Sequence, residues 1–137
     1  MSKSEFTGKC VLVSGAASGL GRAASLRFAE EGAMLCLADL NRKGLEETAG
    51  RIKEAGGEAV ICDGDLGDPQ QCGEAVAAAI DAFGRLDVVC NVAGILRFHA
   101  LGDVTPDDWR KLFSANVDSA FFLIQAAMPH LLKTQGN

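Results

Sequence analysis

Gly15, Gly19 and Gly21 lie in a stretch of small residues between the apolar run Cys10–Val13 and a helical pattern that begins near Gly19. The first turn of a helix has unpaired N–H groups and a positive dipole end, which together attract a pyrophosphate. Glycines leave room for the phosphate and let the helix cross the strand closely, because they lack a Cβ. The stretch therefore predicts a phosphate-binding loop. Its spacing, G-x-x-x-G-x-G, differs from the general G-x-G-x-x-G fingerprint, and no Lys-Ser or Lys-Thr follows it as in a Walker loop.

An acidic residue strengthens this interpretation, since small-residue turns between a strand and a helix are common on their own. The next apolar run, Leu35–Ala38, ends at Asp39, which comes 18 residues after Gly21. A carboxylate at this strand end can accept hydrogen bonds from both hydroxyls of an adenosine ribose. The two features together favour a nucleotide ligand.

These residues must be positioned by strands and helices that alternate along the whole chain. The apolar runs do not alternate polar with apolar residues, which is typical of strands buried on both faces. We expect strands at 9–14, 34–38, 59–62 and 86–90, and helices at 19–31, 43–55, 69–83 and 107–133. Asp68-Pro69 and Thr105-Pro106 have the residue types that begin helices, and Gly32 has the type that ends one.

Two helices have features that make further predictions. On the first helix, Leu20, Ala23, Ala24 and Phe28 are expected to share one apolar face. In the last helix, Pro129 is expected to kink or weaken the end, because proline has no N–H to donate.

The alternation predicts an α/β fold with a parallel sheet covered by helices on both faces. Right-handed crossovers make it a three-layer, doubly wound sheet, with a ligand crevice at the carboxyl ends of the strands. The chain has 137 residues, of which 48% are hydrophobic, which is enough apolar material for one core. We therefore expect one domain over residues 1–137.

Composition excludes several classes of partner. The net charge is −5, and no cluster of basic and aromatic residues is present, which argues against nucleic acid and anionic membranes. The polar start lacks the apolar core of a signal peptide, and no apolar run is long enough to span a bilayer. We therefore predict a cytoplasmic protein. The five cysteines form no C-x-x-C pair and lie mostly in apolar runs, so we expect free, buried thiols and no metal site.

Five motifs, in order, resemble those of the classical short-chain dehydrogenase/reductase family. Ser14–Gly21 is similar to its T-G-x-x-x-G-x-G loop, with serine in place of threonine. Asn91–Gly94 is similar to its N-N-A-G element, with Val92 replacing the second asparagine. Asp39 and Asp65-Leu66 match its ribose and adenine positions, and Asn116 lies in a segment similar to the one with the catalytic asparagine. The resemblance implies a Rossmann-like sheet, here truncated to about four strands.

The resemblance also implies a role for each matching position. Gly19 and Leu20 would offer N–H groups to the pyrophosphate, and Ser18 would bind a ribose or phosphate oxygen. Asn116 would be the catalytic residue of this part of the chain, positioning a water in a proton relay. The implied cofactor-binding set is Gly15, Ser18, Gly19, Leu20, Gly21, Asp39, Leu40, Asp65, Leu66, Asn91, Ala93, Gly94 and Ile95.

The charges near the ribose position favour NAD over NADP. Asp39 would repel a 2′-phosphate. The position before Gly19 is Ser18, where NADP-preferring members of the family often have lysine or arginine. Arg42 is the one residue that argues the other way, since it could reach a 2′-phosphate.

The family's catalytic serine and Tyr-x-x-x-Lys pair follow a fifth strand, and the chain has no tyrosine at all. The resemblance therefore implies the cofactor-binding half of an oxidoreductase acting on an alcohol/ketone pair, inactive alone. The alternative is a short nucleotide-binding or dimerisation module without catalysis. In that alternative the fourth strand would be an exposed edge beside apolar helix surface, and the chain should self-associate. The expected state of the protein is a homo-oligomer, either a dimer or a tetramer.

Overall fold

The computed structural model describes residues 4–137, in which four parallel strands form one sheet in the order β3-β2-β1-β4. The strands are β1 (Cys10–Ser14), β2 (Met34–Asp39), β3 (Glu58–Asp63) and β4 (Val88–Asn91). The helices are α1 (Gly19–Glu30), α2 (Arg42–Glu54), α3 (Pro69–Phe83), α4 (Pro106–Phe113) and α5 (Ser119–Thr134), with a 3-10 turn at Leu101–Asp103. The predicted α/β class with a doubly wound parallel sheet is confirmed.

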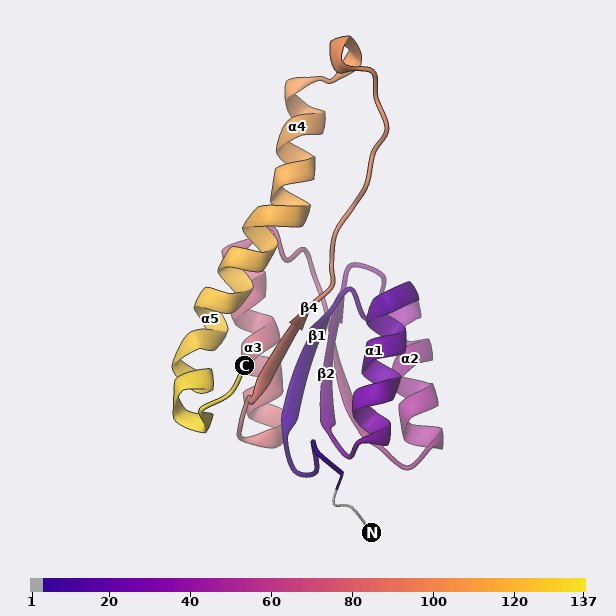
Figure 1. Ribbon diagram of the computed structural model, residues 1–137, viewed down its shortest axis with the longest axis vertical. Coiled ribbons are helices and arrows are strands. Elements are labelled where there is room, and N and C mark those ends of the chain that lie inside the picture. The colour runs from indigo at the N-terminus through magenta and orange to yellow at the C-terminus, as the bar shows by residue number, and fades with distance from the viewer. Residues whose placement is uncertain (1–3) are drawn as a thin grey trace.

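Helices cover both faces of the sheet, so the molecule has three layers (Figure 1). Helices α1 and α2 lie on one face, and α3 and α5 lie on the other. Helix α4 and the loop before it extend beyond the carboxyl ends of the strands. This arrangement leaves those ends accessible between the two helical layers.

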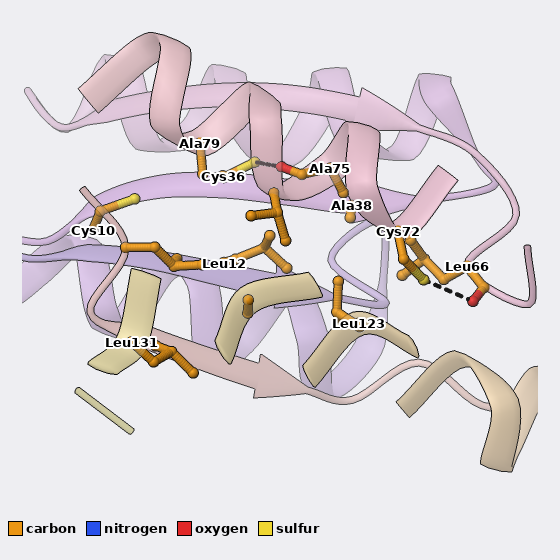
Figure 2. Close-up of a cluster of buried hydrophobic side chains, with 13 residues drawn as sticks. Cys10, Leu12, Cys36, Ala38, Leu66, Cys72, Ala75, Ala79, Leu123 and Leu131 are labelled. Carbon is orange, nitrogen blue, oxygen red and sulfur yellow. Dashed lines mark hydrogen bonds between the residues drawn. The ribbon is translucent and has the colours of Figure 1, made fainter. Parts of the chain in front are cut away.

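The strands are buried on both faces, as their unbroken apolar runs predict. Val11 and Val13 of β1 pack into the core under α1 and α2, whereas Cys10 and Leu12 pack into the core under α3 and α5. Figure 2 shows the second of these cores, where Leu12 and Leu123 lie among small alanine and cysteine side chains. Small residues let the helices approach the sheet closely.

The predicted helix caps form. The Asp68 carboxylate accepts a hydrogen bond from the N–H of Gln70 at the start of α3, with Pro69 in the first turn. Thr105 and Asp108 make a reciprocal capping box at the start of α4. Gly32 has a φ of +85°, the left-handed conformation expected of a glycine just after a helix.

All five cysteines are free thiols, and Cys10, Cys36 and Cys72 are buried, as predicted. Cys62 and Cys90 are only half-buried, because they lie on the strands at the two edges of the sheet. Burial is the main reason that the pKa of Cys10 is raised to about 12 and that of Cys72 to about 11. These two thiols are therefore protonated and unreactive at neutral pH.

The predicted apolar face of α1 is only partly correct, since Phe28 packs against the core but Leu20 and Ala23 do not. Leu20 is 79% exposed and Ala23 is exposed, whereas Gly21 and Ser25 are buried. At its start the helix contacts the sheet through small residues, and the Ser25 hydroxyl is satisfied by a 2.7 Å hydrogen bond to the Gly21 carbonyl. Further along, Leu26 and Phe28 are partly buried against the core. Close packing of helix on strand decides the buried face over the first turns of α1.

The last helix and the fourth strand also differ from prediction. The helical run divides into α4, a π-helical segment at Ser114–Asp118, and α5, which continues past Pro129 to Thr134. Strand β4 begins at Val88, two residues later than expected, and ends at Asn91. Within residues 4–137 the structure forms no helix with both the length and the apolar composition that a membrane span requires.

Candidate functional site

A cleft with a volume of about 440 Å³ lies at the carboxyl ends of the strands. It brings together the loop after β1, the end of β2, and the segments that follow β3 and β4, as expected at a point where the strand order reverses. Of the predicted cofactor-binding residues, those that line it are Gly15, Ser18, Gly19, Leu20, Gly21, Asp39, Leu40, Asp65, Leu66, Ala93, Gly94 and Ile95. Asn91, the last residue of β4, is not among the lining residues and accepts a hydrogen bond from Ser14.

Each of the three glycines of the loop lies in a different steric environment. A Cβ on Gly21 would overlap the carbonyl group of Gly15, so glycine lets α1 cross close to β1. A Cβ on Gly15 would lie 2.9 Å from the backbone nitrogen of Ala93, which approaches from β4. Gly19 has a φ of +53°, and a Cβ there would meet no atom of the described chain within 4 Å. The space beside Gly19 is thus open towards the cleft.

The start of α1 presents unpaired donors to this space. The first intrahelical hydrogen bond runs from the Arg22 N–H to the Ser18 carbonyl, at 3.1 Å. The N–H groups of the first turn therefore have no partner within the helix. Among the described residues, the Ser18 side chain makes no capping hydrogen bond either, although Ser18 occupies the N-cap position. Donors and helix dipole at this point suit a phosphate group.

Asp39 faces the same cleft from the end of β2. Its Oδ2 accepts a hydrogen bond from the Ala17 N–H at 3.2 Å, and its Oδ1 accepts one from the Asn41 N–H at 3.0 Å. Each carboxylate oxygen keeps a second lone pair, so the group can still accept hydrogen bonds from a ligand. The exposed side chain of Leu40 lies next to it.

Asp65 and Leu66 form the wall that follows β3. The Asp65 Oδ1 accepts a 2.9 Å hydrogen bond from the Gly67 N–H, and its own N–H donates to Gln71 at 2.6 Å. Leu66 is buried, and its carbonyl accepts a 3.0 Å hydrogen bond from the Cys72 thiol (Figure 2). The segment is therefore a fixed turn, with the Asp65 backbone and the Leu66 region held from behind by α3.

Ser14 has a role that its sequence position alone did not reveal. Its buried hydroxyl donates to the Asn91 Oδ1 at 2.8 Å and accepts hydrogen bonds from the N–H groups of Val92 and Ala93, at 3.0 and 3.1 Å. It thereby joins the glycine loop to the turn after β4. A hydroxyl at the end of an otherwise apolar buried strand is the signal, since a buried polar group needs partners.

Asn116 lies in the π-helical segment and holds the turn after β4 from the other side. Its Oδ1 accepts from the Ile95 N–H, and its Nδ2 donates to the carbonyls of Ile95 and Leu112, all at 2.9 Å. Both amide hydrogens are thus used within the protein. Only the second lone pair of Oδ1 is left for a water or ligand.

Arg42, the cation nearest to Asp39 in sequence, is paired with two carboxylates. Its Nε donates to Glu46 at 3.0 Å, and its Nη1 donates to Asp63 at 2.7 Å. The hydrogen bond to Glu46 and the charge of Asp63 raise the pKa of Arg42 further above its ordinary value. The guanidinium is therefore directed along α2 and towards the end of β3.

Apart from this cleft, the part of the chain that the structure describes forms no metal site but does form a further hollow. Within residues 4–137, no group of three His, Cys, Asp or Glu side chains is placed to hold a metal ion. A second hollow of about 330 Å³ lies at the opposite end of the sheet, between the carboxyl ends of α1 and α2. It is lined by glycines, by apolar side chains such as Leu26 and Ile52, and by two glutamates, and it contains none of the predicted cofactor-binding residues.

Comparison with known proteins identifies relatives over nearly the whole chain. Residues 9–137 match the family model of the short chain dehydrogenases. The chain is 38% identical, over 129 residues, to a 2,5-dichloro-2,5-cyclohexadiene-1,4-diol dehydrogenase from Sphingobium indicum. It is 36% identical, over 127 residues, to an L-rhamnose 1-dehydrogenase (NAD(P)(+)) from a Sphingomonas species. These alignments cover 94% and 92% of this chain, but 52% and 50% of the relatives.

The fold comparison agrees with the sequence comparison. The crystal structure of a hydroxysteroid dehydrogenase from Escherichia coli superposes with a TM-score of 0.89 at 30% identity. The superposition covers 93% of this chain and 54% of that one. The chain therefore spans about half the length of the proteins it matches.

Proposed function

The chain belongs to the short chain dehydrogenase family of oxidoreductases, and we propose that it forms the NAD(H)-binding part of an enzyme that interconverts an alcohol and a ketone. One observation carries the proposal most directly. The cleft combines the open first turn of α1 with a carboxylate on the neighbouring strand, the two groups that a dinucleotide needs. We assign residues 1–137 to the Rossmann domain. The family's catalytic serine, tyrosine and lysine would lie in a portion outside them.

The residues of the cleft fit this cofactor. The N–H groups of Gly19 and Leu20 would hold the pyrophosphate, with Ser18 beside them, and Asp39 would accept the hydroxyls of the adenine-side ribose. Asp65 and Leu66 would frame the adenine. The turn after β4, Ala93–Ile95, would pass under the second ribose and the nicotinamide. When bound, the nicotinamide supplies hydride transfer to or from the substrate carbon.

The charges favour NAD over NADP. The Asp39 carboxylate would repel a 2′-phosphate. Arg42, which could have offset this repulsion, already pairs with Glu46 and Asp63. A 2′-phosphate would have to compete with both carboxylates for that guanidinium, so NADP should bind more weakly.

We also propose that Asn116 is the catalytic residue of this part of the chain and positions a water in a proton relay. Because both hydrogens of its amide are donated to Ile95 and Leu112, the water would have to donate to Oδ1. The same hydrogen bonds hold Ile95 in place beside the nicotinamide position.

Replacement of Asp39 by alanine tests the cofactor assignment. Loss of charged hydrogen bonds to the ribose should cost about 1.5–3 kcal/mol of NAD binding, which is roughly a 10- to 100-fold rise in Kd. Isothermal titration of the full-length protein with NAD and NADP measures this change. Asp81→Ala, at an exposed position on α3, is the control and should leave both affinities unaltered. Unchanged NAD affinity in Asp39→Ala would refute the ribose assignment.

A second candidate function is a nucleotide-binding or dimerisation module without catalysis, which the absence of tyrosine from this sequence favours. The intact mass of the protein made from its native reading frame separates the two candidates. A mass near 14.3 kDa would support the module. A clearly larger mass, with alcohol-dependent reduction of NAD, would support the enzyme.

We further propose a cytoplasmic location and a homo-oligomeric state. Five free cysteines, three of them buried, fit a reducing compartment. An apolar stripe on α4 and α5, which includes the exposed side chains of Phe113, Phe121 and Met128, fits association with a second copy.

A further inference from the structure

The part of the glycine loop behind the cleft is Ala16 and Ala17, and all four of its backbone polar groups have partners on β2, α1 or α2. The Ala16 N–H donates to the Ala38 carbonyl and the Ala17 N–H donates to Asp39 Oδ2, both at 3.2 Å. The Ala16 carbonyl accepts from the Thr48 hydroxyl at 2.9 Å. The Ala17 carbonyl accepts from Arg22 Nη2 at 2.6 Å. The loop is thus fixed from behind.

Arg22 and Thr48 form one unit that links α1, α2 and the loop. Arg22 Nε donates to the Thr48 hydroxyl at 2.9 Å, while its Nη2 also reaches the Gly44 carbonyl and the Glu47 carboxylate, at 3.2 and 3.1 Å. Thr48 is fully buried. A Cβ on Gly44 would lie 2.7 Å from the Ala17 carbonyl oxygen, so α2 presses directly against the loop.

We propose that Arg22 and Thr48 are positioning residues for recognition of the cofactor pyrophosphate, an inference that rests on the proposed function. Ala16 and Ala17 immediately precede Ser18, Gly19 and Leu20, which line the cleft. Because a peptide unit is planar, the held carbonyl of Ala17 fixes the direction of the Ser18 N–H, and the held carbonyl of Ala16 fixes that of the Ala17 N–H. The chain therefore enters the first turn of α1 in a fixed orientation. The two side chains hold the loop carbonyls, and neither is among the residues that line the cleft. They act on the ligand through the loop.

The contacts of Arg22 and Thr48 differ from those of Asp39. Arg22 and Thr48 hold the loop carbonyls, whereas Asp39 accepts from the Ala17 N–H and would also lie against the adenosine end of the cofactor, with Asp65 and Leu66. Loosening the loop should therefore weaken binding of ligands that contain a pyrophosphate. It should leave the binding of adenosine alone unaltered.

The test uses the full-length protein with two probes, ADP-ribose and adenosine, whose Kd values are measured by titration. Thr48→Val removes the hydroxyl at nearly constant volume, and Arg22→Met removes the guanidinium. Each is expected to raise the Kd of ADP-ribose roughly 5- to 10-fold, the effect of about one hydrogen bond, and to change that of adenosine less than about twofold. Thr48→Ser keeps the hydroxyl and should restore wild-type affinity.

Two matched control substitutions remove the same side-chain groups from helix positions that do not contact the loop. Thr134→Val removes a hydroxyl that donates to the Leu86 carbonyl. Arg27→Met removes an arginine of α1 that pairs with Glu30 of the same helix and with Glu31 just after it. Neither should change the affinity for either probe. Hydrogen exchange at the Ala16 and Ala17 amides, which both donate hydrogen bonds within the protein, should accelerate only in Thr48→Val and Arg22→Met.

Three outcomes would count against the inference. Unaltered ADP-ribose affinity in both variants would overturn the positioning role alone. Equal losses for both probes would overturn it as well, because they would indicate a general structural defect. Failure of the wild-type protein to bind either probe would overturn the proposed function, and the positioning role with it.

Discussion

At the scale of single residues, the carboxylate of Asp87 joins the amino-terminal ends of β1 and β4. It is buried, and it accepts hydrogen bonds from the Cys10 N–H at 2.9 Å and from Arg85 Nε and Nη2 at 2.8 and 2.6 Å. Burial raises the pKa of Asp87, but the hydrogen bonds from Arg85 and Cys10 and the charges of Arg85 and Lys9 outweigh burial and lower it below its usual value. The ionised group therefore stabilises the folded chain.

Asp87→Asn should lower the free energy of unfolding by about 2 kcal/mol at pH 7, because a buried charged hydrogen-bond acceptor is lost. The folded pKa is lower than the unfolded one, so this stabilisation is complete above the unfolded pKa of about 4. It is lost as the pH falls through the folded pKa. Urea unfolding at pH 7 and at successively lower pH should show the difference between wild type and variant narrowing in acid.

Asp107→Asn is the control. Asp107 is exposed, and among the described residues its one ion pair is with Arg110 of the same helix. It should change stability by only a few tenths of a kcal/mol. A difference between wild type and Asp87→Asn that stays constant down to pH 3 would contradict the role given to the ionised carboxylate.

At the scale of elements, the crossing of α1 over β1 depends on the absence of a side chain at Gly21. A methyl group there would overlap the Gly15 carbonyl, which is backbone and cannot move aside without deforming the loop. Gly21→Ala should therefore destabilise the protein by about 2–3 kcal/mol and also impair NAD binding. Thermal unfolding and an NAD titration measure the two effects.

Gly50→Ala is the matched control, because Gly50 lies within α2 and a Cβ there would meet nothing within 4 Å among the described atoms. Alanine favours the helix at such a position, so this variant should gain about 0.5–1 kcal/mol of stability. Equal effects of the two substitutions would show that the crossing is not the cause.

At the same scale, the type and ends of each element could be predicted from residues close together in the sequence, but the face that it buries could not. The caps at Asp68 and Thr105 and the buried strands follow from neighbouring residues. The buried face of α1 does not follow from neighbouring residues, because Leu20 and Ala23 are more apolar than Ser25 and yet are exposed to solvent, whereas Ser25 is buried. The outcome depends on how closely α1 approaches β1, which is a property of the pair of elements.

At the scale of the whole molecule, α4, the π-helical segment and α5 present one continuous apolar stripe. Its members are exposed and follow one another at intervals of three or four residues, so they lie on one side of the helical run. They are Trp109, Phe113, Val117, Phe121, Ile124, Met128 and Leu132. Phe121, Ile124, Met128 and Leu132 line one apolar hollow. An exposed surface of this kind marks an interface.

We expect this stripe to mediate self-association. Phe121→Glu combined with Met128→Glu should shift the protein from an oligomer to a monomer, because two charges would be buried without partners. Analytical ultracentrifugation of the full-length protein measures the change. Lys111→Glu, an exposed position on α4 outside the stripe, should leave the oligomer intact. A wild-type protein that sediments as a clean monomer would contradict the expectation.

The sequence by itself determined the alternation of strands and helices, the glycine loop, and the acidic and amide residues at the strand ends. These features depend on residues close together in the chain, where periodicity, capping and glycine spacing are expressed directly. The placement of Gly15, Asp39 and Asp65 around one cleft also followed, since parallel strands bring their carboxyl ends to the same edge.

Only the tertiary structure decided what holds that cleft in shape. The hydrogen bonds of Ser14 to the turn after β4, of Thr48 to Arg22 and to the loop, and of Asn116 to Ile95 join residues far apart along the chain. The pairing of Arg42 with Asp63 depends in the same way on the order of strands in the sheet. Such contacts arise from the packing of distant segments, which no local pattern specifies.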